Sequence, residues 1–479
     1  MKQKKPRKAH ILLLLIALFG LFLRLIFFSG MGISDSLVYS KAAHDINEGS
    51  GIDPESTLTL YTRLGLIYPT ALSYRLFGIN DLSSVIFVLI TSVASIILIF
   101  YFGKLLFNEK TGLIASFLLS FFPLDVVYAT KLNSDLPSAF LMALGIYLFL
   151  YSEKTGKLKI NYFVAGMLIG IGYMIRESAL LVALFFIAYV ISKKQINKEY
   201  FLVPLGVMAI FIAESLLFLS LTGDLLFRFH ASQKYLIEAM LAHNYFGRLD
   251  FPTGLLHYPW LFLTNNLLSF FYAFIFIAVI YLLYCKRKET YGMMLWLVPL
   301  LLYLSFGSAS LASYTPFMAV DRYTSIVTIP ALLLLSVFLL EERRVIKKWA
   351  MPASLAFLLL ASVVAVYTRE DRNSLENLRE AYPFLKGLNK TVFIDGRSLA
   401  AVSYIGEYSI NKNLEKYPDS LGKAKNSYIA INRNMIRNLK EANKNLKFPS
   451  EIKNIPKEWK VIKEFGSSEK DKIVVYQIP

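Results

Sequence analysis

Ionisable side chains flank the apolar stretches of this sequence at positions where a carboxylate or a guanidinium could do chemistry. A carboxylate can act as a general base, and an arginine binds phosphate through two parallel hydrogen bonds. Charges at the edge of a hydrocarbon layer need water or partners. Ten such residues recur along the chain: Asp35, Asp45, Arg63, Asp125, Lys131, Asp135, Arg176, Glu177, Asp321 and Arg322. If they share one polar cavity, Arg176 and Arg322 near a carboxylate would form a site for a phosphate and a base.

The same residues also have structural explanations. Asp35, or the serine before it, could cap the amphipathic segment "SDSLVYSKAAHDINEG", and Asp135 could cap the apolar run that it opens. Arg63 could be an anchor at headgroup level. Arg176 and Glu177 could pair with each other in a loop between two apolar runs. Capping and catalysis are compatible, because an acid held at a helix start keeps its charge and its direction.

The composition places these residues in a membrane protein. The chain has 479 residues, of which 56% are hydrophobic and 15% aromatic, and its mean hydropathy is +0.50. The single cysteine, Cys285, excludes a disulfide framework and a cysteine-based metal site. The five histidines show no ligand spacing, and the sequence has no Walker loop, GxGxxG or GxSxG motif. Nucleotide-driven chemistry therefore has no support.

Apolar runs long enough to cross a bilayer recur along the first three quarters of the chain. Eleven membrane spans are predicted: 10–29, 83–103, 111–128, 134–151, 161–176, 178–192, 201–221, 266–285, 291–306, 324–340 and 349–367. The first run follows the basic residues "MKQKKPRK" and is too long for a signal-peptide core, so we expect it to be retained.

Lysine and arginine alternate between the loops in a way that predicts topology. Six alternate segments hold 20 Lys and Arg against 6 Asp and Glu: "MKQKKPRK", "GKLLFNEK", "SEKTGKLK", "SKKQINKE", "CKRKET" and "EERRVIKK". These segments are expected in the cytoplasm, which puts the N-terminus inside and, with eleven spans, the C-terminal region outside. The net charge of +17 is then partly a topology signal, and no nucleic-acid partner is expected.

Three long segments are predicted on the outer side of the membrane. The first loop, about 30–82, would hold interfacial helices, and a second loop covers about 222–265. The tail alternates strand and helix patterns, which predicts a small extracytoplasmic α/β domain. The chain therefore divides into a transmembrane domain, 1–368, and a soluble domain, 369–479.

Five motifs, in their order along the chain, resemble a known family. They are "DSLVYSKAAHDINEG", "YPTALSYRLFG", "LNSDLPSAF", "GIGYMIRESALL" and "DRYTSIVTIP". The set is similar to the GT-C superfamily of integral-membrane glycosyltransferases, and to its branch of protein O-mannosyltransferases and lipid A aminoarabinose transferases. The resemblance covers about 1–340. Position 36 is Ser where many relatives carry a second acid, which weakens the case for a metal held by two adjacent carboxylates.

The resemblance implies a GT-C fold and a cell-membrane glycosyltransferase that uses a polyprenyl-phosphate sugar. The acceptor, which could be a protein, a lipid or a glycan, would be reached at the extracytoplasmic face. Asp35 would be the general base of a single displacement with inversion. Donor and acceptor would be bound by Tyr39, Arg63, Tyr68, Lys131, Asp135, Arg176, Glu177, Arg322 and Tyr323. A divalent cation, held by Asp35 and Asp135, is possible but not required.

Two other interpretations stay open at the level of sequence. A transporter or flippase of a lipid-linked sugar would show inverted repeats and charges near the middle of the membrane. No repeat is visible, although Glu214 lies inside a predicted span and favours this alternative slightly. A membrane anchor that presents the tail as a binding module would not need eleven spans.

Overall fold

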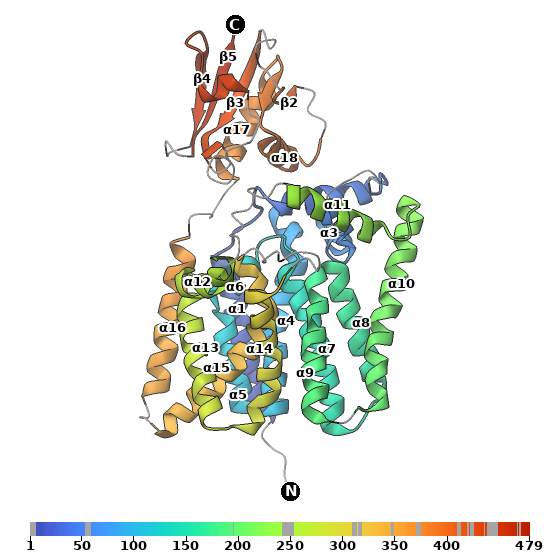
Figure 1. The fold of residues 1–479 in the computed structure, drawn as a ribbon. Helices are drawn as coiled ribbons and strands as arrows, with labels where there is room; N and C mark the ends of the chain where they lie inside the picture. The colour runs from blue at the N-terminus through green and yellow to red at the C-terminus, as the bar shows by residue number, and fades with distance from the viewer. Residues whose placement is uncertain are drawn as a thin grey trace.

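The structure is a bundle of long helices with a small α/β domain above one end (Figure 1). This end of the bundle, beneath the C-terminal domain, is called the domain-side end below. The computed structural model describes residues 6–52, 59–194, 196–241, 253–308, 314, 319–345, 349–369, 375–409, 413–418, 421, 426–434, 436–437, 449–466, 468 and 471–479.

Each of the eleven predicted spans contains a helix among the described residues. The bundle helices are α1 (Pro6–Ile26), α4 (Asp81–Leu106), α5 (Glu109–Ser120), α7 (Asp135–Thr155), α8 (Ile160–Ile175), α9 (Val182–Lys193), α10 (Leu202–Thr222), α13 (Ser269–Tyr284), α14 (Tyr291–Phe306), α15 (Ser325–Val345) and α16 (Ala350–Tyr367). By length and composition, seven of the described helical segments could cross a membrane, and α8 and α13 are shorter apolar helices. Helices α5 and α9 have 12 residues each, roughly 18 Å, so the count of eleven crossings stays a prediction.

Short elements gather at the domain-side end of the bundle (Figure 1). They are α2 (Asp35–Asn47), η1 (Thr59–Thr62), α3 (Leu64–Phe77), α6 (Pro123–Tyr128), η2 (Glu177–Leu181), α11 (Phe227–Leu241), η4 (Thr253–Leu256), α12 (His257–Thr264) and η6 (Asp321–Thr324). The predicted long loop, 222–265, therefore contains helices α11 and α12, while its residues 242–252 lie outside the described part. Two further turns, η3 (Lys198–Phe201) and η5 (Lys288–Thr290), precede α10 and α14.

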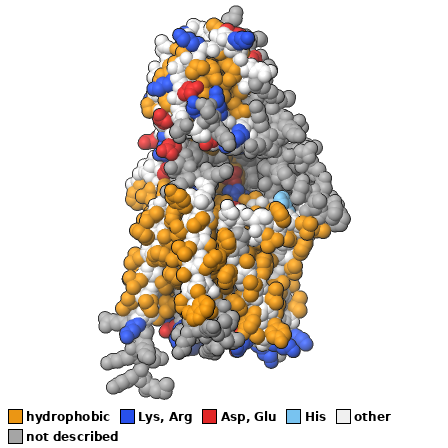
Figure 2. Space-filling view, turned by 90° about the vertical axis from the view of Figure 1, so that its left-hand side faces the viewer, with side chains coloured by type: hydrophobic (Ala, Val, Ile, Leu, Met, Phe, Trp, Pro, Cys, Tyr) orange, Lys and Arg blue, Asp and Glu red, His pale blue; other side chains and the backbone are white. Residues whose placement is uncertain are grey.

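The helices pack through small residues and a shared apolar core. Helix α8 meets α10 so closely that a Cβ on Gly166 would lie 2.0 Å from the carbonyl oxygen of Val203, and one on Gly206 would lie 2.2 Å from that of Phe163. Only glycine permits this approach, which is typical of helix pairs in membranes. Apolar side chains cover the face of the bundle that Figure 2 shows, and Lys and Arg are seen at its end away from the C-terminal domain.

The C-terminal domain is a five-stranded mixed sheet in the order β2-β1-β3-β5-β4. Its elements are α17 (Glu376–Gly387), β1 (Val392–Ile394), α18 (Gly396–Ile405), β2 (Leu414–Lys416), β3 (Ser427–Asn432), α20 (Ser450–Lys453), β4 (Lys460–Phe465) and β5 (Ile473–Ile478). Strand β1 runs parallel to β2 and β3, and β5 runs antiparallel to β3 and β4. The predicted small α/β domain is present. One of the helix patterns in its sequence, "NMIRNLKEANKNL", lies mostly outside the described residues.

Candidate active site at the domain-side end

Arg322 links two carboxylates that come from distant parts of the chain. It lies in η6, and its Nη2 is 2.9 Å from Oδ2 of Asp35, the first residue of α2. Its Nε is 3.4 Å from Oδ2 of Asp135, the first residue of α7. Ser34 is the N-cap of α2 and makes no side-chain capping bond. The contact shows that the Asp35 carboxylate is turned towards Arg322, and the Asp35 side chain is 36% exposed.

Arg176 holds the other side of the Asp135 carboxylate. Its Nη1 lies 2.5 Å from Oδ1 of Asp135 and 3.3 Å from the hydroxyl of Ser134. Its guanidinium carbon lies 4.4 Å from the ring centroid of Tyr323, the residue after Arg322. Helix α8 ends at Ile175, and Arg176 follows it with an extended backbone, φ at −160°. Asp135 thus fixes two guanidinium groups at once.

Arg63 joins this cluster to α2. It precedes α3 and donates hydrogen bonds to the hydroxyls of Tyr39 and Ser134, the latter at 2.9 Å. Tyr39 lies four residues after Asp35, on the same face of α2. Burial is the main cause that raises the pKa of Tyr39, although the Arg63 charge opposes it. Tyr39 therefore stays protonated and has a hydrogen to donate.

Glu177 and Arg228 extend the network towards α10. Nη2 of Arg228, on α11, lies 2.8 Å from the Glu177 carboxylate, and its Nη1 lies 2.5 Å from the buried carboxylate of Glu214. Nη2 of Arg63 is 3.8 Å from Glu177. Burial would raise the pKa of Glu177, but the guanidinium groups of Arg228 and Arg63 outweigh it and lower the pKa to about 2. Glu177 is thus an anion at neutral pH, and its cationic partners are Arg228 and Arg63 instead of its neighbour Arg176.

The network contains four acids and four arginines, so its formal charge balances, and the hydroxyl of Ser134 links Arg176 to Arg63. Its members are Asp35, Arg322, Asp135, Arg176, Arg63, Glu177, Arg228 and Glu214. A recess with acidic and basic side chains is seen between the bundle and the C-terminal domain (Figure 2). An incoming anion would compete with the carboxylates for guanidinium groups, and a carboxylate released in this way would become available to accept a proton.

Arg228 is the site residue that the sequence reasoning missed. Its surroundings, "LLFRFHASQKYL", give no sign of a buried arginine. The sequence signal for Arg228 was its partner Glu214, because an acid inside an apolar helix needs a cation nearby. The pairing gives Glu214, which lies near the middle of α10, a cation from within the protein, so this acid no longer favours a transporter.

Other predicted residues lie at the edge of the network or apart from it. Tyr68 packs with Phe227, the residue before Arg228, in a small apolar cluster. Lys131 lies over the ring of Tyr128, 5.4 Å from its centroid. Asp125 was grouped with the outer-face residues but pairs with Arg24 of α1, at 3.9 Å, within a separate buried cluster. The sequence reasoning missed this pair, and the signal that could have found it is Arg24 itself, because an arginine inside an apolar run requires a partner.

Two more outer-face residues have contacts of their own. The carboxylate of Asp321 accepts a hydrogen bond from the Tyr128 hydroxyl at 2.8 Å and one from the backbone N–H of Arg322 at 2.7 Å. It thereby orients η6, which carries Arg322 into the network. Asp45 pairs with Lys41 on the exposed side of α2 and takes no part in the network.

The donor set fits a divalent cation poorly. Arg322 occupies the space between the carboxylates of Asp35 and Asp135, the two predicted ligands. Among the residues that the structure describes, no group of three or more His, Cys, Asp or Glu side chains gathers in a way that could hold a metal ion. A cation between the two acids would have to displace the guanidinium, so no step below is routed through a metal.

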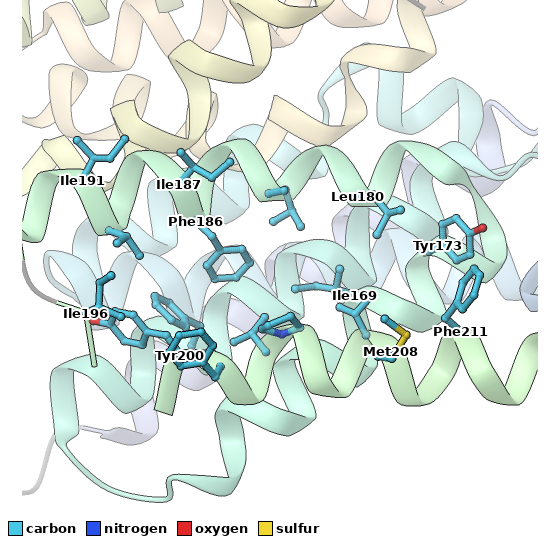
Figure 3. A pocket seen from close by; sticks show the side chains of 18 residues that line it. Ile169, Tyr173, Leu180, Phe186, Ile187, Ile191, Ile196, Tyr200, Met208 and Phe211 are labelled. Atoms are coloured by element: carbon cyan, nitrogen blue, oxygen red, sulfur yellow. The ribbon is translucent and has the colours of Figure 1, made fainter. Parts of the chain in front are cut away.

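An apolar groove of about 750 Å³ lies between α9 on one side and α8 and α10 on the other. Its lining runs from Ile196 and Tyr200 at one end to Tyr173 and Phe211 at the other (Figure 3). Tyr173 and Phe211 also line a second hollow, of about 290 Å³, that contains Arg228. The groove therefore leads along the bundle to the part of the network that contains Arg228. The described lining of the groove carries no charged side chain.

Comparisons with known proteins agree with this architecture. A family model described as dolichyl-phosphate-mannose-protein mannosyltransferase matches residues 64–218, from α3 to α10. ArnT from Cupriavidus metallidurans in the apo state is similar in structure, with a TM-score of 0.64 at 12% identity, over 98% of this chain and 97% of that chain. The apo oligosaccharyltransferase from Archaeoglobus fulgidus has a TM-score of 0.58 at 14% identity, over 99% and 76% of the two chains. No curated protein sequence matches this chain significantly.

The chain thus has the GT-C fold of integral-membrane glycosyltransferases, and the superfamily predicted from the sequence is confirmed. The description of the matching family model agrees with the predicted class of enzyme. The matched range contains Asp135, Arg176 and Glu177.

Proposed function

We propose that this protein transfers a sugar from a polyprenyl-phosphate donor to an acceptor at the extracytoplasmic face of the cell membrane, by an inverting displacement in which Asp35 is the general base. One observation carries the proposal. The Asp35 carboxylate belongs to a network of guanidinium groups that begins at the end of an apolar groove.

The donor would lie with its polyprenyl chain in the groove and its phosphate at the domain-side end. The groove suits a hydrocarbon chain, since its lining is apolar from Ile196 to Phe211. Arg228 would then be the first guanidinium to meet the phosphate, followed by Arg63. Two solved neighbours bind such lipids: ArnT was solved with undecaprenyl phosphate, with a TM-score of 0.60, and the archaeal oligosaccharyltransferase AglB with a dolichol-phosphate, with a TM-score of 0.53.

The reaction would proceed in one displacement. The acceptor O–H or N–H attacks the anomeric carbon, the bond from this carbon to the phosphate oxygen breaks, and its electron pair stays on the phosphate. Asp35 takes the acceptor proton, while guanidinium groups neutralise the charge that builds up on the phosphate. Because Arg322 holds Asp35 before substrate binds, competition by the phosphate for arginines would release the base at the moment when it is needed.

The acceptor side is open to several chemistries. The recess beneath the C-terminal domain would receive a protein, a lipid or a glycan, and helix α11 from the second long loop would border it. The proposed orientation puts this recess outside the cytoplasm. The orientation is supported by the excess of lysine and arginine in the loops at the other end of the bundle, which are expected in the cytoplasm.

The transfer reaction can be tested with purified protein in liposomes that contain a labelled polyprenyl-phosphate sugar. A glycosyltransferase moves the label to an acceptor fraction added on the side of the C-terminal domain. A flippase, the alternative interpretation, predicts label that crosses the bilayer while still attached to the lipid. This second outcome would contradict the proposal.

A further inference from the structure

The C-terminal domain touches α2, the helix that begins with Asp35. Tyr408, just after α18, donates a hydrogen bond to Oγ of Ser40 at 2.8 Å. Its ring stacks on the ring of His44, with centroids 4.6 Å apart and planes 20° from parallel. Ser40 is five residues after Asp35, roughly 7.5 Å along the helix. A shift of Tyr408 would therefore be passed to Asp35 through less than two turns of rigid helix.

A chain of hydroxyl groups connects this contact to the bundle and returns to the C-terminal domain. Ser40 Oγ lies 2.6 Å from the hydroxyl of Tyr74 on α3, which in turn lies 2.8 Å from Oγ of Ser84 on α4. Tyr404, from α18, approaches Ser84 at 3.0 Å and closes the chain. A connected set of hydroxyl groups, each hydrogen-bonded to the next, fixes its side chains more firmly than isolated hydrogen bonds would.

The backbone at this contact adopts an unfavourable conformation. Glu407 and Tyr408 have φ values of 53° and 57°, in the left-handed region that bulky residues rarely adopt. The backbone N–H of Tyr408 holds the turn by donating to the carbonyl of Ser403 at 2.7 Å. Strained residues of this kind cluster where their geometry serves a function. Here the turn presents the Tyr408 ring and hydroxyl to α2.

The other end of α2 is fixed by the bundle itself. Ser36 Oγ donates to the carbonyl of Leu132 at 2.8 Å, in the loop before α7, and Tyr39 accepts from Arg63. The helix is thus held between the bundle and Tyr408. We infer that Tyr408 is a positioning residue through which the C-terminal domain sets the place of Asp35 relative to Arg322; as a statement about catalysis, this inference rests on the function proposed above.

The kinetic test compares Tyr408→Phe with Tyr417→Phe in the full-length protein. Each variant loses one hydroxyl of the same domain, since Tyr417 donates to the carbonyl of Ala430 at 2.7 Å and does not face α2. We expect Tyr408→Phe to lower kcat on the order of tenfold with little change in the KM for donor, because a misplaced base slows the chemical step. Tyr417→Phe should keep the kcat of the parent. Equal kcat values for the two variants would overturn the inference.

A second measurement does not depend on sugar transfer. Ser36→Cys in a Cys285→Ser background gives one buried thiol at the start of α2, and its rate of reaction with a polar maleimide reports how firmly α2 is held. Tyr408→Phe should raise this rate severalfold, and Tyr417→Phe should not. If the protein transferred no sugar but the rate rose, the proposed reaction would fail while the positioning of α2 would stand. An unchanged rate would overturn the positioning.

The variant Tyr408→Gly distinguishes loss of the contact with α2 from disruption of the turn after α18. Glycine adopts φ near 57° without strain, so the turn after α18 should keep or gain stability although the ring and the hydroxyl are lost. We expect fast labelling of the thiol introduced by Ser36→Cys in a protein that still unfolds in one cooperative thermal transition. Slow labelling with this variant would contradict the inference.

Discussion

Arg322 and Asp35 form an ion pair of 2.9 Å although 287 positions separate them in the chain. The pair joins η6, near the end of the membrane bundle, to α2, in the first loop after α1. Because Arg322 also contacts Asp135, the three residues bring three distant segments together at one place. A base held next to a cation in this way is well suited to a reaction that begins with the arrival of an anion.

Replacing Arg322 by lysine keeps the charge but removes the planar fork that reaches two carboxylates. A hydrogen bond to a charged group contributes about 1.5–3 kcal/mol, so kcat/KM for sugar transfer should fall tenfold or more. Arg287→Lys is the matched control, because Arg287 pairs with Glu341 outside the network. Equal activities of the two variants would remove Arg322 from the site.

Arg228→Gln should destabilise the protein, because it leaves the carboxylate of Glu214 buried without its cation. Breaking a buried ion pair in this way typically costs about 3–5 kcal/mol, whereas replacing both charges is far milder. The thermal unfolding midpoint of Arg228→Gln should therefore fall, and adding Glu214→Gln should restore part of it. A double variant less stable than Arg228→Gln would show that the two residues do not act as a pair.

Filling the groove should weaken binding of the donor chain. Ala183 on α9 lines the groove, and Ala183→Trp should raise the KM for a long-chain donor by about tenfold, equivalent to about 1.4 kcal/mol of binding. A donor with a chain of only two isoprene units should be little affected. Ile280→Trp is the control, because it places an equally bulky side chain on the exposed face of α13, outside the groove. The same KM increase for both donors would place the chain elsewhere.

The single cysteine allows a direct measurement of topology. Cys285 is exposed and follows α13 at the end of the bundle away from the C-terminal domain. In intact cells it should resist a membrane-impermeant maleimide and react only after permeabilisation. Ser34→Cys in a Cys285→Ser protein should show the opposite pattern, since position 34 is exposed at the start of α2. Labelling of Cys285 from outside would reverse the proposed orientation.

The sequence predicted most of the network because a polar residue at the edge of an apolar run is costly and therefore informative. Asp35, Asp135, Arg176 and Arg322 were expected together, and the structure brings all four into contact. The eleven helical stretches followed from the same contrast between apolar runs and charged loops. Their hydropathy could not say whether 12-residue helices such as α5 cross the bilayer.

Pairings inside the bundle were harder to predict, because sequence shows that a buried charge needs a partner but not which one. Glu214 pointed to a cation without naming Arg228, and Asp125 was assigned to the polar cavity although Arg24 holds it. The contact of Tyr408 with α2 depends on how the two domains dock, which the sequence does not show. The left-handed backbone of Tyr408 could not be predicted either, because tyrosine rarely adopts this conformation.

The central claim is that Asp35 accepts the proton of the acceptor. Asp35→Asn removes the base and keeps the size of the side chain, and Asp45→Asn is the matched control, since Asp45 pairs with Lys41 on the exposed side of α2. With labelled polyprenyl-phosphate sugar, at equal protein levels in membranes, we predict a loss of turnover of roughly 10²–10⁴-fold for Asp35→Asn and none for Asp45→Asn. Turnover of Asp35→Asn close to that of the unmodified protein would contradict the account.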